Sequence, residues 1–296
     1  MIVAQENMLC PPLASDRACV SYLFRKRWPR GFKCSFCGAL QKEMPPACAV
    51  VCRYCRKQNS ITAHTLMHGS KKSLVAWMLV AWQFCLREQG ISARELQRLM
   101  ELSCYQTAWS WLQKIRQAAA LVESAKCQGT VLLCRHPLSI ATAQKTSVPE
   151  IVLALELEPF GKSDQSGRVR FVVLNETESE AGMTPFNSMI ERGSSVLVRE
   201  LNELPLSALQ SYPCVQMTGK QKEKGRRLFE EMEVWLNRIY RKAIDVGHLQ
   251  SYLDEFSFRY NTSSWSDHFT VFDHLVTGLV TRVAINRGYR GASREE

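Results

Sequence analysis

The sequence predicts an α/β protein of several domains, and three observations carry this prediction. Two C-x-x-C pairs lie 14 residues apart near the N-terminus, at Cys34/Cys37 and Cys52/Cys55. Apolar residues recur at helical spacing from about residue 70 to residue 120. Beyond residue 120, short runs of strand character are followed by two helical segments. The predicted order is a metal-binding ribbon, a helix-turn-helix-like helical region and a mixed sheet with flanking helices.

The positive charge of the chain is unevenly placed. The 296 residues include 38 Lys/Arg and 28 Asp/Glu, a net charge of +10. Residues 1–120 hold 17 Lys/Arg against 6 Asp/Glu, whereas residues 121–296 hold 21 against 22. This asymmetry is expected of an N-terminal part that contacts phosphates. A solvated basic face without a partner is the alternative.

The cysteine content and the apolar runs indicate a compartment. There are 12 cysteines, but the start MIVAQENMLC lacks a charged n-region and a long apolar core, so we expect a reducing cytosol and a nucleoid-associated protein. The longest apolar run, Leu74–Trp82, is far shorter than the roughly 18 residues that span a bilayer. We therefore expect no membrane partner.

The two C-x-x-C pairs predict a zinc ribbon. Each pair places two thiolates on one tight turn, which Gly38 helps to close after the first pair, and two facing turns complete the tetrahedral site that structural Zn²⁺ prefers. Cys48 precedes Cys52 by four residues and could replace it, although we treat it as a bystander. The alternative is two unrelated turns with unligated cysteines. The predicted zinc ligands are Cys34, Cys37, Cys52 and Cys55.

Helices are predicted on both sides of the ribbon. Asp16–Lys26 forms a short amphipathic helix that Pro29 and Gly31 end, and residues 32–63 form short antiparallel strands. Ser70 or Ser73 caps a helix that runs to about Glu88. Because that helix is apolar nearly all round, we expect it to be buried. Its predicted core residues are Trp77, Leu79, Val80, Trp82 and Phe84.

The segment that begins at Gly90 has the pattern of a helix-turn-helix. Ser92 caps the first helix and Glu95 completes a capping box, while Ser103 caps the second helix. The second helix has a core stripe of Ala108, Trp111, Leu112, Ile115 and Ala119. Its opposite face carries Gln106, Ser110, Gln113, Lys114 and Gln117. Such side chains can read base edges or contact phosphates, although an ordinary solvated face would look similar.

The remainder of the chain predicts a sheet and further helices. The expected strands are Thr130–Cys134, Ile151–Leu157, Arg168–Leu174 and Ser195–Val198. The expected helices are Glu180–Arg192, Gly225–Ala243 and Gly247–Tyr260. Residues 285–296 are predicted to be a disordered tail.

Together these segments resemble one family, the bacterial insertion-sequence transposases in which an N-terminal zinc ribbon precedes a DDE-type, RNase H-like nuclease domain. The resemblance rests on segments 27–38, 52–58, 60–65, 90–93, 107–109 and 248–261, with Trp77. It implies the following domains: an N-terminal helical segment (1–31), the zinc ribbon (32–63), a helical DNA-binding region (64–122), an RNase H-like domain (123–262) and a C-terminal helix with its tail (263–296).

The resemblance implies a nuclease site that this chain lacks in part. The family holds two divalent metal ions with acidic residues at strand ends and on a following helix. At the first position the chain has Cys134 and Arg135, and at the second it has Arg199, with Glu200 one residue later. A thiol and a cation cannot replace hard oxygen ligands for Mg²⁺. Glu233 is the best remnant of the third position, although a helix-surface carboxylate would look the same.

The sequence therefore favours a transposase-derived protein that binds double-stranded DNA and has lost the nuclease activity. One alternative is a working transposase whose Mg²⁺ is held by Glu156, Glu200 and Glu233. A second is a protein- or RNA-binding subunit of a larger assembly; a homo-oligomer or an accessory partner is compatible with each. The predicted DNA contacts are Arg53, Arg56, Lys57, Lys71, Lys72, Gln106, Ser110, Gln113 and Lys114. A basic cluster of Lys220, Lys222, Lys224, Arg226 and Arg227 adds phosphate contacts or is a solvated loop.

Overall fold

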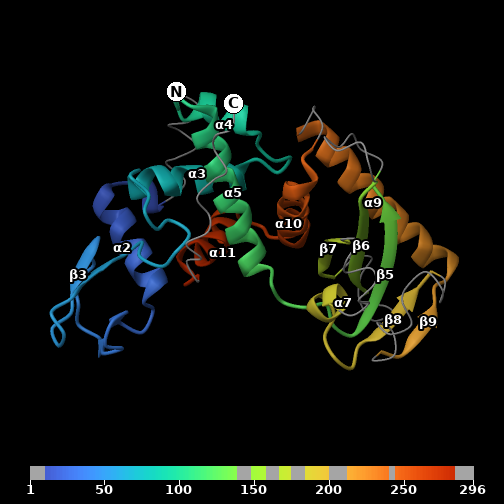
Figure 1. The fold of residues 1–296 in the computed structure, drawn as a ribbon, viewed down its shortest axis with the longest axis horizontal. Coiled ribbons are helices and arrows are strands. Elements are labelled where there is room, and N and C mark those ends of the chain that lie inside the picture. Colours follow the sequence, from blue (N-terminus) through green and yellow to red (C-terminus); the bar gives the residue numbers. More distant parts are fainter. Residues whose placement is uncertain are drawn as a thin grey trace. The chain divides into compact units, whose positions relative to one another are not determined.

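The computed structural model describes residues 11–138, 148–157, 167–174, 184–199, 212–239 and 244–283. The chain forms two compact units, Met1–Leu86 with Asp267–Glu296, and Arg87–Ser266 (Figure 1). The predicted helical region 64–122 therefore has residues in both units. Glu200 and the predicted tail, 285–296, lie outside the described residues. None of the helices within the described ranges combines the length and the apolar character that crossing a membrane requires.

The first unit has a core of three helices, α2 (Asp16–Arg27), α3 (Leu74–Leu86) and α11 (His268–Val280). Of the two caps predicted for α3, the structure uses Ser73, whose Oγ accepts from the Ala76 amide at 3.1 Å. Ser70 instead accepts from the Trp77 indole N–H at 2.9 Å. The predicted α3 core is confirmed, since Trp77, Val80, Trp82 and Phe84 are buried and Leu79 is half-buried.

Contacts between distant parts of the sequence hold the first unit together. The Phe272 ring of α11 stacks on Tyr22 at 5.9 Å and meets the edge of Trp82 at 5.6 Å between centroids. The Asp273 carboxylate accepts from the Tyr22 hydroxyl at 3.0 Å and pairs with the Lys26 ammonium at 2.5 Å. These contacts join a helix near the N-terminus to one near the C-terminus.

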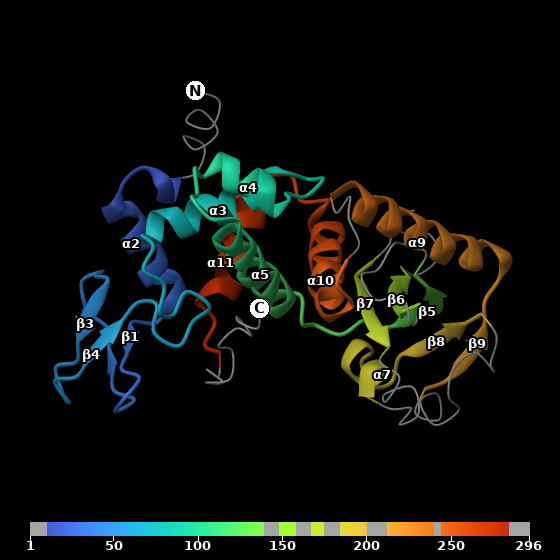
Figure 2. The same cartoon turned by 45° about the horizontal axis from the view of Figure 1, so that its top comes forward.

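The ribbon consists of two antiparallel hairpins in the first unit (Figure 2). The first pairs β1 (Phe32–Lys33) with β2 (Leu40–Gln41), and the second pairs β3 (Ala49–Val51) with β4 (Gln58–Ser60). Arg27, at the end of α2, donates to the carbonyl oxygens of Ser60, Ile61 and Ala63. Burial lowers the pKa of this guanidinium to about 10, so it remains charged at neutral pH.

The second unit begins with two helices, α4 (Ala93–Leu99) and α5 (Tyr105–Val122). The predicted cap of α4 is confirmed, because the Ser92 Oγ accepts from the Glu95 amide at 3.2 Å. The predicted cap of α5 is wrong: its N-cap residue is Cys104, which makes no side-chain capping bond. The predicted core stripe of α5 is buried throughout.

A five-stranded mixed sheet follows, in the order β7-β6-β5-β8-β9. Strands β5 (Thr130–Pro137), β6 (Glu150–Leu157) and β7 (Val169–Leu174) are antiparallel neighbours. Strands β8 (Ser195–Val198) and β9 (Cys214–Gln216) run parallel to β5. The short helix α7 (Thr184–Met189) lies between β7 and β8 in the sequence. The four predicted strands are confirmed, and β9 is an addition.

Two hydrophobic clusters cover the two faces of the sheet. On one face, Leu132, Leu153 and Phe171 pack against α9 (Gly219–Ile239) and α10 (Val246–Thr262). On the other face, Leu133, Val152 and Val196 pack against α7. Figure 2 shows α9 above the sheet and α7 below it. The predicted mixed sheet with flanking helices is therefore present.

Helix α10 also covers the edge strand β7. The Gln250 carboxamide accepts from the Val173 amide at 2.9 Å and donates to the Phe171 carbonyl at 2.9 Å. The Asn261 carboxamide accepts from the Val169 amide at 2.8 Å and donates to its carbonyl at 3.1 Å. These bonds occupy backbone groups that an open sheet edge would present to another chain.

A buried carboxyl group on α10 makes stability depend on pH. Burial raises the pKa of Asp254 from 3.8 to about 6, against the opposing effects of a Gln250 hydrogen bond and of Arg170. The folded state therefore binds more protons than the unfolded state between these two values, and stability falls as the pH rises through this window. We predict that Asp254→Asn raises the free energy of unfolding at pH 7.5 by roughly 1–2 kcal/mol.

Urea denaturation at pH 4.5 and pH 7.5 measures this effect. The gain from Asp254→Asn should be larger at pH 7.5 than at pH 4.5, whereas the exposed Glu231→Gln should show no such difference. An equal gain at both pH values would show that ionisation of Asp254 is not the cause.

Candidate functional site

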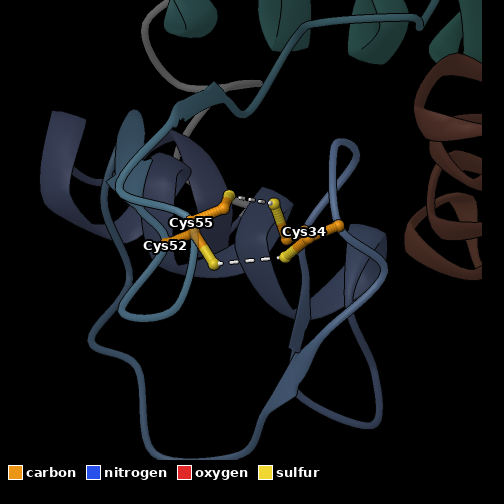
Figure 3. Close-up of side chains that lie close together, drawn as sticks. Cys34, Cys52 and Cys55 are labelled. Carbon is orange, nitrogen blue, oxygen red and sulfur yellow. Dashed lines mark hydrogen bonds between the residues drawn. The ribbon is translucent and has the colours of Figure 1, made fainter.

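The four cysteines predicted as metal ligands lie together in the ribbon. Their sulfur atoms are all within 4.8 Å of one another, in the one such group of potential metal ligands found among the described residues. Sγ of Cys34 is 3.6 Å from that of Cys55 (Figure 3). Sγ of Cys37 is 3.7 Å from that of Cys52. Zinc–sulfur bonds of about 2.3 Å in a tetrahedron place sulfurs about 3.8 Å apart, so the cluster fits a four-coordinate metal ion.

The two C-x-x-C turns, Cys34–Cys37 and Cys52–Cys55, are called knuckles below, and they have the same backbone geometry. The Gly38 amide donates to the Cys34 carbonyl at 3.1 Å, and the Arg56 amide donates to the Cys52 carbonyl at 3.0 Å. Both residues have a positive φ, 73° for Gly38 and 59° for Arg56. Glycine adopts this conformation without strain, whereas arginine does not. Cys48 is exposed and is not part of the sulfur cluster.

Two buried carboxamides connect the hairpins in a crossed arrangement. Gln41 of the first hairpin donates to Cys52 Sγ at 3.2 Å and accepts from the Arg53 amide at 3.1 Å. Asn59 of the second hairpin donates to Cys34 Sγ at 3.6 Å and accepts from the Ser35 amide at 2.9 Å. Each hairpin thus orients the first cysteine of the other knuckle, and such donors stabilise a thiolate ligand.

The surroundings of the thiols shift their pKa values in opposite directions, downward for Cys34 and Cys52 and upward for Cys55. Burial raises the pKa of Cys34, but amide donors from Cys37 and Phe36 outweigh this effect and lower the pKa to about 6. The Cys55 amide and further donors likewise lower the pKa of Cys52. For Cys55, the Lys57 amide lowers the pKa, but burial and the neighbouring thiols together raise it to about 11. A bound cation would favour the ionised form of Cys55, so metal binding would release a proton there.

The predicted DNA contacts fall in both units. Arg53, Arg56 and Lys57 of the ribbon are exposed, as are Lys71 and Lys72 in the turn before α3. On α5 of the second unit, Gln106 is exposed, whereas Ser110, Gln113 and Lys114 are half-buried. Burial lowers the pKa of Lys114, and the Gln113 side-chain nitrogen is buried without a hydrogen-bond partner. The ribbon and the α3 turn are therefore the more accessible part of the predicted interface.

Two of the positions that the resemblance assigns to nuclease acids, those of Cys134 and Arg199, lie next to each other on the sheet. The register pairs Leu133 of β5 with Val198 of β8, so Cys134 and Arg199 directly follow paired residues on adjacent parallel strands. Helix α9 meets β5 here at Gly225, where a Cβ would lie 2.7 Å from Cys134 Sγ. Arg135 ion-pairs with Glu150. A thiol, a guanidinium and a residue without a side chain therefore stand at this place.

The two described carboxylates considered as replacements, Glu233 and Glu156, lie on opposite faces of the sheet. Glu233 follows Gly225 by eight residues, about 12 Å along α9, and its carboxylate lies 3.7 Å from His136 Nε2. Glu156 accepts from the amides of Gln128 and Arg168, at 2.9 and 3.0 Å, on the opposite face of the sheet. Of these two described carboxylates, neither contacts the other.

The predicted basic cluster is helical rather than a loop. Lys220, Lys222, Lys224, Arg226 and Arg227 lie in the first turns of α9, which begins at Gly219 instead of the predicted Gly225. Hydrogen bonds from Arg226 and Arg227 lower the pKa of Glu223 to about 2, and Arg226 also pairs with Glu230. The two arginines are thus partnered within the helix.

Gln41 and Asn59 are the site residues that sequence reasoning missed. A signal was present, because each follows the second cysteine of a knuckle by four residues, Cys37 and Cys55 respectively.

Comparisons with protein-family models, with curated proteins and with solved structures give no match.

Proposed function

We propose that this chain is a zinc-containing, transposase-derived protein that binds double-stranded DNA, and that its sheet domain is RNase H-like without nuclease activity. The observation that carries the proposal is that Cys134 and Arg199 stand on adjacent parallel strands at the two strand ends where the resemblance requires acidic metal ligands. Neither residue supplies an oxygen ligand for Mg²⁺. Helix α9 also lies directly against Cys134, which leaves no room for a longer side chain at position 225.

The strand arrangement supports the RNase H-like part of the proposal. Three antiparallel strands, β5 to β7, are extended by β8 and β9, which run parallel to β5. A helix lies between β7 and β8, and the long α9 follows β9. The resemblance predicts acidic residues at strand ends and on a following helix; Cys134 and Arg199 stand at strand ends, and Glu233 lies on α9. We infer a nuclease scaffold kept for association or positioning on DNA.

The zinc assignment is supported by the ligand set. Four thiolates in a closed tetrahedral arrangement are typical of structural zinc. The crossed carboxamide bonds of Gln41 and Asn59 supply the second layer of hydrogen bonds that such sites use. The four sulfurs leave no open coordination position for a substrate, so the role of the metal is to hold the two hairpins together.

The proposed DNA binding predicts a specific salt dependence. Neutralising a phosphate releases counterions, so the logarithm of affinity falls linearly with the logarithm of salt concentration, by about 0.9 per phosphate contact. Replacing both Lys71 and Lys72 with glutamine should therefore reduce the steepness of this line by about 1.8 and weaken binding at low salt. Fluorescence anisotropy with a labelled duplex measures both effects. Salt concentrations from about 50 to 200 mM are suitable, because affinity that depends on several phosphate contacts falls by orders of magnitude over this range.

A matched variant controls for net charge. Arg192→Gln combined with Arg238→Gln removes two exposed charges from the second unit and should leave the slope unchanged. Affinity that does not depend on salt, or an equal change of slope in both double variants, would contradict phosphate binding at Lys71 and Lys72.

A further inference from the structure

Two aromatic rings are exposed at the tips of the metal-binding knuckles. The exposed fraction is 56% for Phe36 and 72% for Tyr54. Each residue directly precedes the second cysteine of its knuckle, Cys37 or Cys55. Large aromatic side chains usually contribute to a core, and exposed ones indicate interaction sites when they are grouped with a common chemistry.

The backbone that carries these rings is held in place. The Phe36 amide donates to Cys34 Sγ at 3.4 Å, and the residues preceding the two rings donate their amides to buried carboxamides, Ser35 to Asn59 and Arg53 to Gln41. Arg56 has a φ of 59° in the second knuckle, at the position that Gly38 occupies in the first knuckle. Exposed rings on a rigid turn lose little conformational entropy when a ligand stacks on them.

The charge around the rings is positive. Lys57 Nζ lies 4.9 Å from the centre of the Phe36 ring, in a cation–π contact. Arg53 and Arg56 flank Tyr54 closely in the sequence and are exposed. Residues 32–63 hold five Lys/Arg and one Asp/Glu. Four thiolates and one Zn²⁺ contribute a formal charge of about −2, so the ribbon stays positive with its metal bound.

We propose that the knuckle face, defined as Phe36, Arg53, Tyr54, Arg56 and Lys57, binds unpaired nucleotides. Bases stack on the Phe36 and Tyr54 rings while the three basic side chains contact phosphates. This inference rests on the proposed nucleic-acid binding and names the form of nucleic acid that the ribbon takes. Alternating aromatic and basic groups are the usual means of holding a single strand without reading its sequence.

The same features favour an unpaired strand over a duplex or a protein at this face. Arg53, Arg56 and Lys57, which the sequence predicts as duplex contacts, are thereby reassigned to the single strand, and Lys71 and Lys72 remain as duplex contacts. The flat surface of a base is accessible for stacking on a side chain only where the base is not enclosed between its neighbours in a helix. A protein partner would have to be acidic to match the three basic residues, whereas a nucleic-acid strand supplies both the flat apolar surface and the negative charge.

Anisotropy measurements with the full zinc-loaded chain test the proposal. The probes are a blunt duplex, the same duplex with an oligo-dT overhang, and free oligo-dT and oligo-U strands. We expect the overhang to bind more tightly than the blunt duplex. Because stacking contributes about 1–3 kcal/mol per base, Phe36→Leu and Tyr54→Leu should each weaken overhang binding roughly 5- to 150-fold and leave blunt-duplex binding unchanged.

Two controls separate stacking from general effects. Tyr54→Phe keeps a ring and should retain the overhang preference, and Val51→Thr changes an exposed apolar residue of the same ribbon and should have no effect. Zinc content measured for every variant should match that of the unchanged chain. Comparison of oligo-dT with oligo-U identifies whether DNA or RNA is the preferred strand, and stacking predicts losses with both in the leucine variants.

The outcomes distinguish this inference from the function on which it rests. Equal affinity for blunt and overhang probes, or leucine variants that weaken both alike, would overturn the inference while DNA binding stands. Absence of binding to every probe would overturn both.

Discussion

Glu255→Gln is expected to lower the free energy of unfolding of the second unit by about 3–5 kcal/mol, because it removes the partner of two buried cations. The Glu255 carboxylate is fully buried and lies 2.7 Å from Nε of Arg116 on α5. Its other oxygen accepts from Arg259 at 2.7 and 3.0 Å. A neutral carboxamide cannot compensate two guanidinium charges in this environment. Arg116 also lies 4.6 Å from the centre of the Tyr252 ring.

Urea denaturation of the full chain, followed by circular dichroism, measures this loss. The control is Glu230→Gln, which removes an exposed carboxylate that also pairs with an arginine, Arg226. Exposed ion pairs contribute little, so this variant should unfold as the unchanged chain does. A similarly small effect of Glu255→Gln would mean that the buried network does not hold α5 against α10.

Cys52→Ser is expected to abolish metal binding and unfold the ribbon. Structural zinc contributes roughly 10–16 kcal/mol of apparent binding free energy in small zinc domains, and that free energy is folding free energy. Because Cys52 also accepts the Gln41 hydrogen bond, its loss affects both the metal and the crossed contact between hairpins. Zinc content by atomic emission and protease sensitivity of residues 32–63 are the measurements.

The matched control is Cys48→Ser, only four residues away. Cys48 is exposed and outside the sulfur cluster, so this variant should keep its zinc and its protease resistance. Loss of zinc from Cys48→Ser, with retention in Cys52→Ser, would show that Cys48 and not Cys52 is the fourth ligand.

Features that depend on local spacing could be predicted from the sequence. The C-x-x-C pairs place Cys34 and Cys37 on one turn whatever surrounds them, and the cluster of four sulfurs is found. The apolar stripe of α5 and the Ser92 cap of α4 likewise depend on residues within a few turns. For these elements the pattern along the chain already contains the physical cause.

Features that depend on packing between distant segments could not be predicted in this way. Which residue of α9 faces Cys134 is set by how the helix lies on the sheet, and Gly225 rather than Glu233 occupies that position. The run Gly219–Lys224 resembled a loop because its charged residues obscured the helix start. Strand β9 has three residues and is stabilised by pairing with β8, which no local pattern reveals.

The most direct test is to incubate the zinc-loaded chain with the DNA that flanks its own gene, with and without Mg²⁺ or Mn²⁺. The proposed function predicts a retarded protein–DNA complex and intact DNA strands under every condition. Metal-dependent nicking or strand transfer that disappears in Glu233→Gln would contradict it, and would mean that carboxylates away from Cys134 and Arg199 assemble a working nuclease.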